Sequence, residues 1–534
     1  MRGTYLGRFG VLMGVVLVSI GTIEHDRVVH AGPPPIRAVV PKADDAVSRA
    51  ILSGSPVPRD IRAIRHRLQT QLGGVLTSHI VANGGHEHPT RRGVMFMSFE
   101  SYAGPAPGGS VDEGDLFFGY FLVPQGGQLV VGSGFVELIA WDRAKHRFNF
   151  WELLEGEWHL RGDSDDVLAN VQSINVGAKA PAFTFTRESS DGTPVLRCSG
   201  CHTLGAPIMK ELEAPHNDWW TAKHTLPPGA FTPDAETAAL FRHATDASHL
   251  SALVKKSAER LVAARADAGS SAPLPQRLRS LFSTMEMNLV SDSAPFAERG
   301  ERGTAVEIPT TFFVDARLAP LTRPVSVDLA VYKDALVRVD SRFPSKTSPT
   351  RETRHAFVVP APSFIDARTV DDLVTRGILD DELVADVLAV DMTTPVYSRD
   401  RASLMRFVPA AATDTADLRT RLIAALRTAP AGDRPAHELL SNLTDPSRTA
   451  AAHRAAAAAY LAVCAKAAAT PGTVEGWLRV AGQRRAAIDD AETAMHPQGA
   501  ITERGFRVIF PLQLTTTVET LRIDARTGRA EPVR

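Results

Sequence analysis

Cysteine is scarce in this chain, and its scarcity excludes one class of protein. Three cysteines in 534 residues cannot form the dense disulfide network of a small secreted scaffold. A charge excess is also lacking, because 59 Lys and Arg residues against 60 Asp and Glu residues give a net charge of -1. This balance favours neither nucleic acid nor an anionic membrane as a partner. The motifs G-x-G-x-x-G, G-x-x-x-x-G-K-[ST] and G-x-S-x-G are absent, so nucleotide binding and serine-hydrolase chemistry have no support.

Long apolar stretches are lacking everywhere except at the N-terminus. Arg2 and Arg8 precede the apolar stretch Phe9–Ile23. A short basic region followed by ~7–15 apolar residues is typical of a secretory signal, whereas a membrane-spanning helix needs ~20. We therefore expect residues 1–31 to be a signal peptide, cleaved before Gly32 or retained as an anchor. The protein would then be periplasmic or otherwise exported, with no stable membrane span after cleavage.

The length predicts more than one domain, because a single core rarely grows beyond ~250–300 residues. We expect an α+β protein with a β-rich N-terminal domain, a small and mostly helical segment, and a mixed, mainly helical C-terminal domain. The expected boundaries are 32–90 for a linker and helical lead-in, 91–195 for the β-rich domain, 196–290 for the small segment, and 300–534 for an α+β C-terminal domain of unknown role.

The predicted elements follow from residue periodicity. Runs rich in Phe, Val, Tyr and Trp, separated by Gly, Pro and Asp, predict strands. These runs are Met95–Ser101, Asp115–Val123, Gln128–Trp141, His146–Trp151 and Ala182–Arg187. Apolar residues at helical spacing predict helices, which we place around 45–75, 250–262, 278–285, 327–339, 370–375, 380–390 and 449–469. We also expect a helix start at Thr232-Pro233, a capping box at Thr369, and strands at 312–314, 506–514 and 518–523.

The most specific motif is a C-x-x-C-H formed by Cys198, Cys201 and His202. Its spacing lets two thiols form thioethers with two vinyl groups of one porphyrin, while the histidine reaches the iron from one side. With three cysteines and 17 histidines, about 0.0005 chance occurrences of the pattern are expected in a chain of this length. Haem is attached outside the cytoplasm, and the N-terminal signal independently predicts export.

This motif resembles that of the c-type cytochromes, specifically a single-haem domain within a longer exported bacterial protein. The resemblance covers the motif and the residues up to about 220. The run CSGCHTLGAPIMKELEAPHNDWW is also similar to that of exported proteins with one such motif. The resemblance implies one haem c bound covalently to Cys198 and Cys201, with His202 as an axial iron ligand. A dithiol or disulfide and a zinc site are the alternatives at these residues.

The second axial ligand stays open, and it decides between electron transfer and ligand binding. Met209, His216, His224 and Met285 are the candidates, as is an open sixth position. The structural alternative for Met209 and Met285 is packing in the core, because each continues an apolar helical stripe. Trp219 and Trp220 could wall the haem edge or fill a core.

The sequence supports three functions. The leading hypothesis is a c-type cytochrome that passes single electrons to redox partner proteins of unknown identity. The second is a haem-dependent oxidoreductase or gas-binding protein with an open distal site, because residues 91–202 resemble in layout the c-type cytochromes that have a β-sheet fold. Candidates to line that distal side are Phe117, Phe118, Tyr120 and Phe183. The third is an exported scaffold without haem that carries a disulfide between Cys198 and Cys201.

Three further features have simpler explanations. His86-Glu87-His88 has metal-binding residue types but lies in a Gly, Asn and Pro loop, so we expect a solvated loop. Cys464 lies in an Ala-rich helical run and is expected to be a buried core residue. The charged run 380–382 is expected to complement a helix dipole at a helix start.

Overall fold

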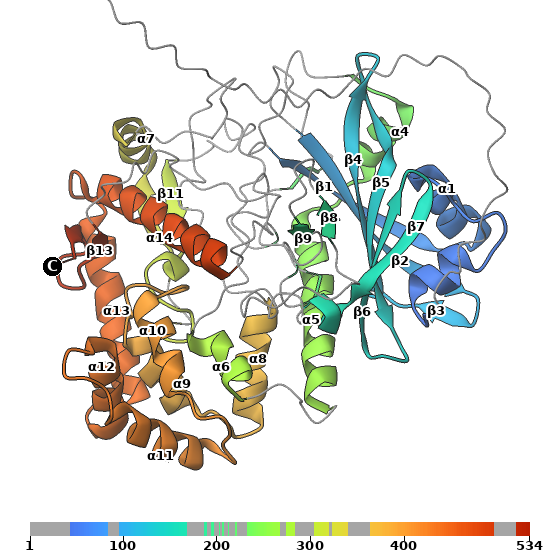
Figure 1. Ribbon diagram of the computed structural model, residues 1–534. Coiled ribbons are helices and arrows are strands. Elements are labelled where there is room, and N and C mark those ends of the chain that lie inside the picture. The colour runs from blue at the N-terminus through green and yellow to red at the C-terminus, as the bar shows by residue number, and fades with distance from the viewer. Residues whose placement is uncertain are drawn as a thin grey trace, which may run out of the picture. The chain divides into compact units, whose positions relative to one another are not determined.

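The computed structural model describes residues 43–83, 95–167, 232–267, 274–282, 304–319, 323–339, 364–495 and 520–533, with short pieces between 186 and 221 (Figure 1). Residues Met1–Pro41 form a separate unit from Lys42–Arg534, and the following sections concern the second unit. The expected signal peptide therefore lies outside the described residues. In the part that is described, every helix is too short or too polar to cross a bilayer.

An antiparallel sheet forms the N-terminal part of this unit, in the strand order β1-β2-β4-β5-β6-β7. The short strands β3 (Gly109–Val111) and β10 (Thr232–Pro233) pair with β2 and β5. The six strands of this order are β1 (Val75–Asn83), β2 (Met95–Ala106), β4 (Leu116–Gln125), β5 (Gln128–Asp142), β6 (Arg147–Leu154) and β7 (Glu157–Asp163). Of the predicted strands, β2, β4, β5 and β6 are confirmed. The strand β1 was not predicted, because it lies in the range 32–90 that was expected to be a linker and helical lead-in.

The two faces of the sheet pack against different helices. Three N-terminal helical segments, η1 (Val47–Leu52), α1 (Ile61–His66) and η2 (Arg67–Gln71), cover one face together with α4 (Ala235–His243) (Figure 1). We call it the α1 face; its buried strand residues include Ile80, Phe96, Phe118, Tyr120, Leu138 and Trp151. The α5 face packs against α5 (Ala247–Asp267), and its strand residues include Val81, Met97, Phe117, Trp141, Phe148 and Phe150. Successive residues of a strand point to opposite faces, so neighbours such as Phe117 and Phe118 are separated.

Helix α5 shows how a helix is fixed on this sheet. Its predicted apolar stripe is confirmed, because Leu250, Val254 and Leu261 are all buried. The guanidinium of Arg260 lies 4.0 Å from the ring centroid of Trp141, which is a cation–π distance. The Ser257 hydroxyl donates to the carbonyl of Gly114 over 2.9 Å. Apolar burial and specific polar contacts together therefore fix the position of α5 along the sheet.

The C-terminal part of the unit is mainly helical, as predicted. Its helices are α6 (Leu274–Phe282), η5 (Thr310–Phe312), α7 (Leu329–Arg338), α8 (Phe364–Thr375), α9 (Asp381–Ala389), α10 (Arg399–Ser403), η7 (Leu404–Phe407), α11 (Thr415–Leu426), α12 (Arg434–Thr444), α13 (Ala450–Ala467) and α14 (Thr473–Met495). Small strand pairs accompany them, namely β11 (Ala305–Ile308) with β12 (Val325–Asp328) and β13 (Leu521–Ile523) with β14 (Ala530–Pro532). Earlier in the chain, between β7 and α4, β8 (Thr186–Glu188) pairs with β9 (Pro194–Leu196). The sheet followed by many helices confirms the α+β class.

Several helices begin at an acidic or hydroxyl side chain that caps their free N–H groups. The Asp380 carboxylate accepts from the N–H of Leu383, and the Thr449 hydroxyl accepts from that of Ala452. Cap positions also correct two predictions. Helix α4 begins after its cap Asp234, so Thr232-Pro233 is a strand instead. Thr369 lies inside α8 and caps nothing there.

Another correction, independent of caps, concerns residues 312–314, which the sequence predicts as a strand. They lie in and after the short helix η5, and all three side chains are buried. A half-buried strand would expose alternate residues, so this run of apolar residues reflects complete burial instead. Ala182 and the next three residues lie outside the described part, which begins again at Thr186 with β8.

Candidate functional site

His202 is the described member of the C-x-x-C-H motif, and it lies against the α5 face. Its Nδ1 is 2.7 Å from the carbonyl oxygen of Ala206. A carbonyl only accepts, so Nδ1 must carry the proton, and Nε2 of the neutral ring is left with its lone pair. Among the described residues, Nε2 has no hydrogen-bond partner. A neutral imidazole with a free Nε2 is the form that binds a metal.

The surroundings of His202 are apolar. Its ring centroid lies 5.5 Å from that of Phe150 on β6. Ala206 belongs to a buried cluster on the same face that also contains Trp141, Phe148, Val167 and Leu261. Burial lowers the pKa of His202 from 6.5 to about 4, against the opposing effect of the Ala206 carbonyl. The imidazole therefore stays neutral over the physiological pH range without a bound metal.

Hydrogen bonds through Gly205 hold His202 next to Ser164, the residue that follows β7. The N–H of Gly205 donates to the carbonyl of His202 over 2.7 Å, which closes a tight turn. The Ser164 hydroxyl donates to the carbonyl of Gly205 over 2.6 Å, and Ser164 is fully buried directly after β7. The histidine is thus held on the sheet through its own loop.

These residues fit a c-type haem. An axial histidine needs a fixed tautomer, an accessible Nε2 and an apolar wall for the porphyrin. The Ala206 carbonyl fixes the tautomer of His202, and Phe150 and the Ala206 cluster supply an apolar wall. Cys198 and Cys201, which would bear the porphyrin, lie outside the described residues, as do the sixth-ligand candidates Met209, His216, His224 and Met285. Phe183 and the His86-Glu87-His88 loop also lie outside them.

Trp219 and Trp220 fill core positions on opposite faces of the sheet. The N–H of Trp220 donates to the carbonyl of Ile80, so the pair continues the sheet beside β1. Trp220 then packs against Phe96 on the α1 face. Trp219 packs against Phe99 on the α5 face, with its Nε1 buried and unpartnered in the described part of the chain. Core filling, the simpler of the two predicted roles, is what these contacts show.

Two of the aromatic residues suggested for a distal haem wall lie on the wrong face. Phe117 is on the α5 face, in the same cross-strand row as Ile139 and Phe150. Phe118 and Tyr120 lie on the α1 face, behind the sheet as seen from His202. That part of the prediction is wrong because it treated a strand as a single patch, whereas strand residues alternate between faces.

Tyr120 instead belongs to a buried polar group on the α1 face. Its hydroxyl donates to Oε1 of Glu100 over 2.5 Å, and Arg65 Nε lies 3.4 Å from the same oxygen. Burial raises the pKa of Glu100, and the nearby guanidinium of Arg65 opposes this rise. Burial also raises the pKa of Tyr120 well above 10. This group ties α1 to β2 and β4.

A pair of histidines on the α5 face was missed by the sequence analysis. His79 on β1 and His249 on α5 are 170 residues apart, and His79 Nε2 lies 3.1 Å from His249 Nδ1. The ring centroids are 5.3 Å apart and the ring planes differ by 13°. Two imidazoles joined end to end by one shared proton have this geometry. Burial and, to a lesser extent, the neighbouring His249 lower the pKa of His79 to about 4.

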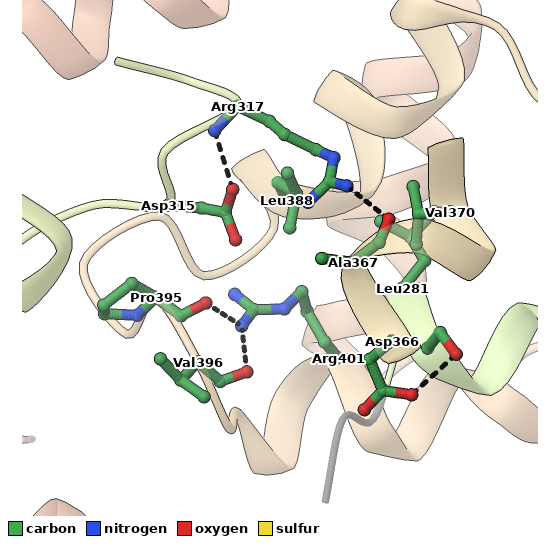
Figure 2. A pocket seen from close by; sticks show the side chains of 11 residues that line it. Leu281, Asp315, Arg317, Asp366, Ala367, Val370, Leu388, Pro395, Val396 and Arg401 are labelled. Atoms are coloured by element: carbon green, nitrogen blue, oxygen red, sulfur yellow. Dashed lines mark hydrogen bonds between the residues drawn. The ribbon is translucent and has the colours of Figure 1, made fainter. Parts of the chain in front are cut away.

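The helical region contains a small pocket between α6, α8, α9 and α10 (Figure 2). Its polar lining is Ser280, Asp315, Arg317, Asp366 and Arg401. Arg401 is 1% exposed, and its Nη atoms donate to the carbonyls of Asp391, Thr394, Pro395 and Val396. Its Nε has no partner among the described residues. The volume open to water is about 20 Å³, roughly one water molecule, so the pocket suits a bridging water and not an organic substrate.

Two other predictions are confirmed. Cys464 is buried within α13, and burial raises its pKa to about 12, so its thiol is not a nucleophile. Asp380 caps α9, as expected for the charged run 380–382. In the described ranges, no group of three or more His, Cys, Asp or Glu side chains is arranged to hold a metal ion.

Comparison with protein-family models, with curated proteins and with solved structures finds no match to this chain. Arguments about function therefore rest on the residues themselves.

Proposed function

We propose that the protein is an exported c-type cytochrome that carries one covalently attached haem and passes single electrons between redox partner proteins. The observation that carries the proposal is the hydrogen bond from His202 Nδ1 to the Ala206 carbonyl, next to a C-x-x-C-H motif. That bond prepares Nε2 as a ligand. A disulfide or dithiol between the two cysteines would need no such arrangement of the histidine.

Each residue has a distinct task in this proposal. Cys198 and Cys201 hold the porphyrin through thioethers, and His202 binds the iron through Nε2. The haem supplies the one-electron chemistry of its iron. Phe150 and the apolar cluster around Ala206 exclude water from one side of the site. Lower polarity around a haem is one of the means by which a protein sets its reduction potential.

The compartment and partners follow from the sequence. The basic residues Arg2 and Arg8 before an apolar stretch support export, and haem c is attached outside the cytoplasm. A net charge of -1 gives no reason to expect nucleic acid as a partner. Long-range attraction to one highly charged redox partner is likewise not favoured by this balance.

The direct test is a haem stain on a denaturing gel, because thioether-bound haem survives denaturation. The wild type, expressed with haem-attachment machinery and exported, should stain. The variant with Cys198→Ser and Cys201→Ser should lose the stain completely. Cys464→Ala is the matched control, because that thiol is buried away from the motif, and it should stain like the wild type. An unstained wild-type band would refute the proposal.

A haem protein with an open sixth position is the second candidate. The observation that favours it is that His202 lies on the face of an antiparallel sheet, beside Phe150. This placement agrees with the layout of the c-type cytochromes built on a sheet. Such a protein would bind a small gas molecule or act as a haem-dependent oxidoreductase, and carbon monoxide binding separates it from an electron carrier.

A further inference from the structure

We infer that Ser164 and Gly205 form a clamp that selects the tautomer of His202 and so presents Nε2 to the haem iron. Both are positioning residues, and neither touches the iron. The inference rests on the proposed function and deepens it, because it names what prepares the iron ligand.

Ser164 joins three segments through one fully buried hydroxyl. Its Oγ accepts a hydrogen bond of 2.9 Å from the N–H of Phe148 on β6. The same hydroxyl donates its single proton to the carbonyl of Gly205 over 2.6 Å. Arg265 on α5 donates to the Ser164 carbonyl over 3.1 Å, which fixes the serine from the helix side. The segment after His202 is therefore attached through Ser164 to both β6 and α5.

Gly205 is required at its position for two independent reasons. Its φ angle is +75°, a left-handed conformation that side chains with a Cβ rarely adopt. A Cβ added to it would also lie 2.3 Å from the carbonyl oxygen of Ser164, well inside van der Waals contact. The close approach of the loop to Ser164 thus depends on glycine.

The clamp acts on the imidazole through the next residue. Fixing the Gly205 carbonyl and the turn back to His202 places the Ala206 carbonyl 2.7 Å from Nδ1. A free histidine side chain in water favours the tautomer with the proton on Nε2, which cannot bind iron through that nitrogen. The Ala206 carbonyl reverses this preference, because it accepts only from a protonated Nδ1. Without the clamp the carbonyl could move away, and both tautomers would be populated.

The first experiment uses the full-length protein made without haem-attachment machinery. The nitrogen chemical shifts of the His202 ring report the tautomer, and His202→Gln assigns the signals by their loss. The wild type should show a proton on Nδ1 only. Ser164→Ala should show a mixture of both tautomers. Ser164→Thr adds a methyl group to the same buried position but keeps the hydroxyl, so it should retain the wild-type tautomer even where it lowers stability.

Ser257→Ala is the matched control. Ser257 is also buried on the α5 face, and its hydroxyl also donates to a backbone carbonyl, that of Gly114, over 2.9 Å. Its loss should leave the His202 ring unchanged. A Ser164→Ala protein with the proton on Nδ1 only would overturn the clamp.

The second experiment uses the haem-loaded protein. The midpoint potential of Ser164→Ala should rise relative to the wild type, because a less firmly held histidine stabilises the ferric iron less. Its low-spin ferric resonance signals should broaden, because the ring samples several orientations. Ser257→Ala should match the wild type in both. Absence of haem from the wild type would refute the proposed function, whereas a haem-loaded Ser164→Ala protein with wild-type potential and signals would refute the clamp alone.

Discussion

The two faces of the sheet bury polar groups in different ways. On the α1 face the buried ionisable groups are carboxyls with several donors each: Glu100 faces Tyr120 and Arg65, and Asp45 accepts from Asn149 and Trp151. The α5 face also buries a carboxyl, Asp115, which pairs with Arg260, but it adds imidazoles, His79 with His249 near β1 and His202 near β6. A buried carboxylate needs partners to offset desolvation, whereas an imidazole is neutral when buried and keeps a lone pair. Both faces therefore use paired carboxyls, and the α5 face alone of the two adds described buried imidazoles that can bind or move a proton.

The largest loss of stability is expected when the shared acceptor of two donors on the α1 face is removed. Asp45→Ala leaves the Asn149 amide and the Trp151 indole N–H, each 2.7 Å from Asp45 Oδ2, without this buried acceptor. At roughly 1–3 kcal/mol for each lost partner, the variant should lose about 2–6 kcal/mol of unfolding free energy. Denaturant unfolding measures this loss.

Asp44→Ala is the control for that experiment. Asp44 is the preceding residue, but its side chain is 52% exposed and lies 3.6 Å from Arg49. An exposed ion pair contributes little, so the change should stay within about 0.5 kcal/mol. Equal losses for the two variants would contradict the account of the α1 face.

Through His79, the α5 face should make the free energy of unfolding depend on pH. The pKa of His79 is lowered to about 4, so between pH 6.5 and 4 the unfolded chain binds a proton that the folded protein does not. The folded state is favoured above pH 6.5 and loses this advantage as the pH falls toward 4. The shift corresponds to about 3 kcal/mol at most. His79→Gln removes the dependence, so the stability gap between wild type and variant should narrow as the pH falls.

Urea unfolding of both proteins at a series of pH values measures this gap. His243→Gln provides the comparison, because His243 is an exposed residue in the last turn of α4. On acidification, the stability difference from the wild type should narrow more for His79→Gln than for His243→Gln. A stability difference between wild type and His79→Gln that does not change with pH would show that His79 does not titrate as described.

The smallest expected difference in stability comes from comparing one buried tryptophan on each face. Trp151 on the α1 face donates from Nε1 to Asp45, whereas Nε1 of Trp219 on the α5 face is buried without a partner in the described structure. Changing either residue to phenylalanine removes the same volume. Trp151→Phe should therefore cost about 1–3 kcal/mol more than Trp219→Phe, which is the difference made by one buried hydrogen bond. Thermal or denaturant unfolding of the two variants decides this.

Local patterns predicted much of the fold. The strands β2, β4, β5 and β6 and the helices α5, α7, α9 and α13 follow from periodicity and caps, which involve residues close together in the sequence. The strand β1 was missed because its pattern is broken by polar residues such as His79, which is buried in the fold and lies 3.1 Å from His249. The prediction of a strand at 312–314 was wrong because an apolar run that is completely buried can be either a strand or a short helix.

The candidate site was predictable only in part, for the same reason. The spacing of Cys198, Cys201 and His202 is local and can be read directly. The contact of Ser164 with Gly205 joins residues 41 positions apart, and that of His79 with His249 joins residues 170 apart. Each serine, glycine or histidine is ordinary in its own sequence neighbourhood. Tertiary packing gives these residues their roles.

The visible spectrum of the purified exported protein, reduced with dithionite and recorded before and after addition of carbon monoxide, tests the central claim most directly. A haem iron bound by His202 and a second protein ligand predicts a low-spin ferrous spectrum that carbon monoxide does not change. A carbon monoxide shift would contradict electron transfer as the function and favour the open sixth position. The absence of any haem absorption, with haem-attachment machinery present during expression, would contradict the account of His202 as an iron ligand.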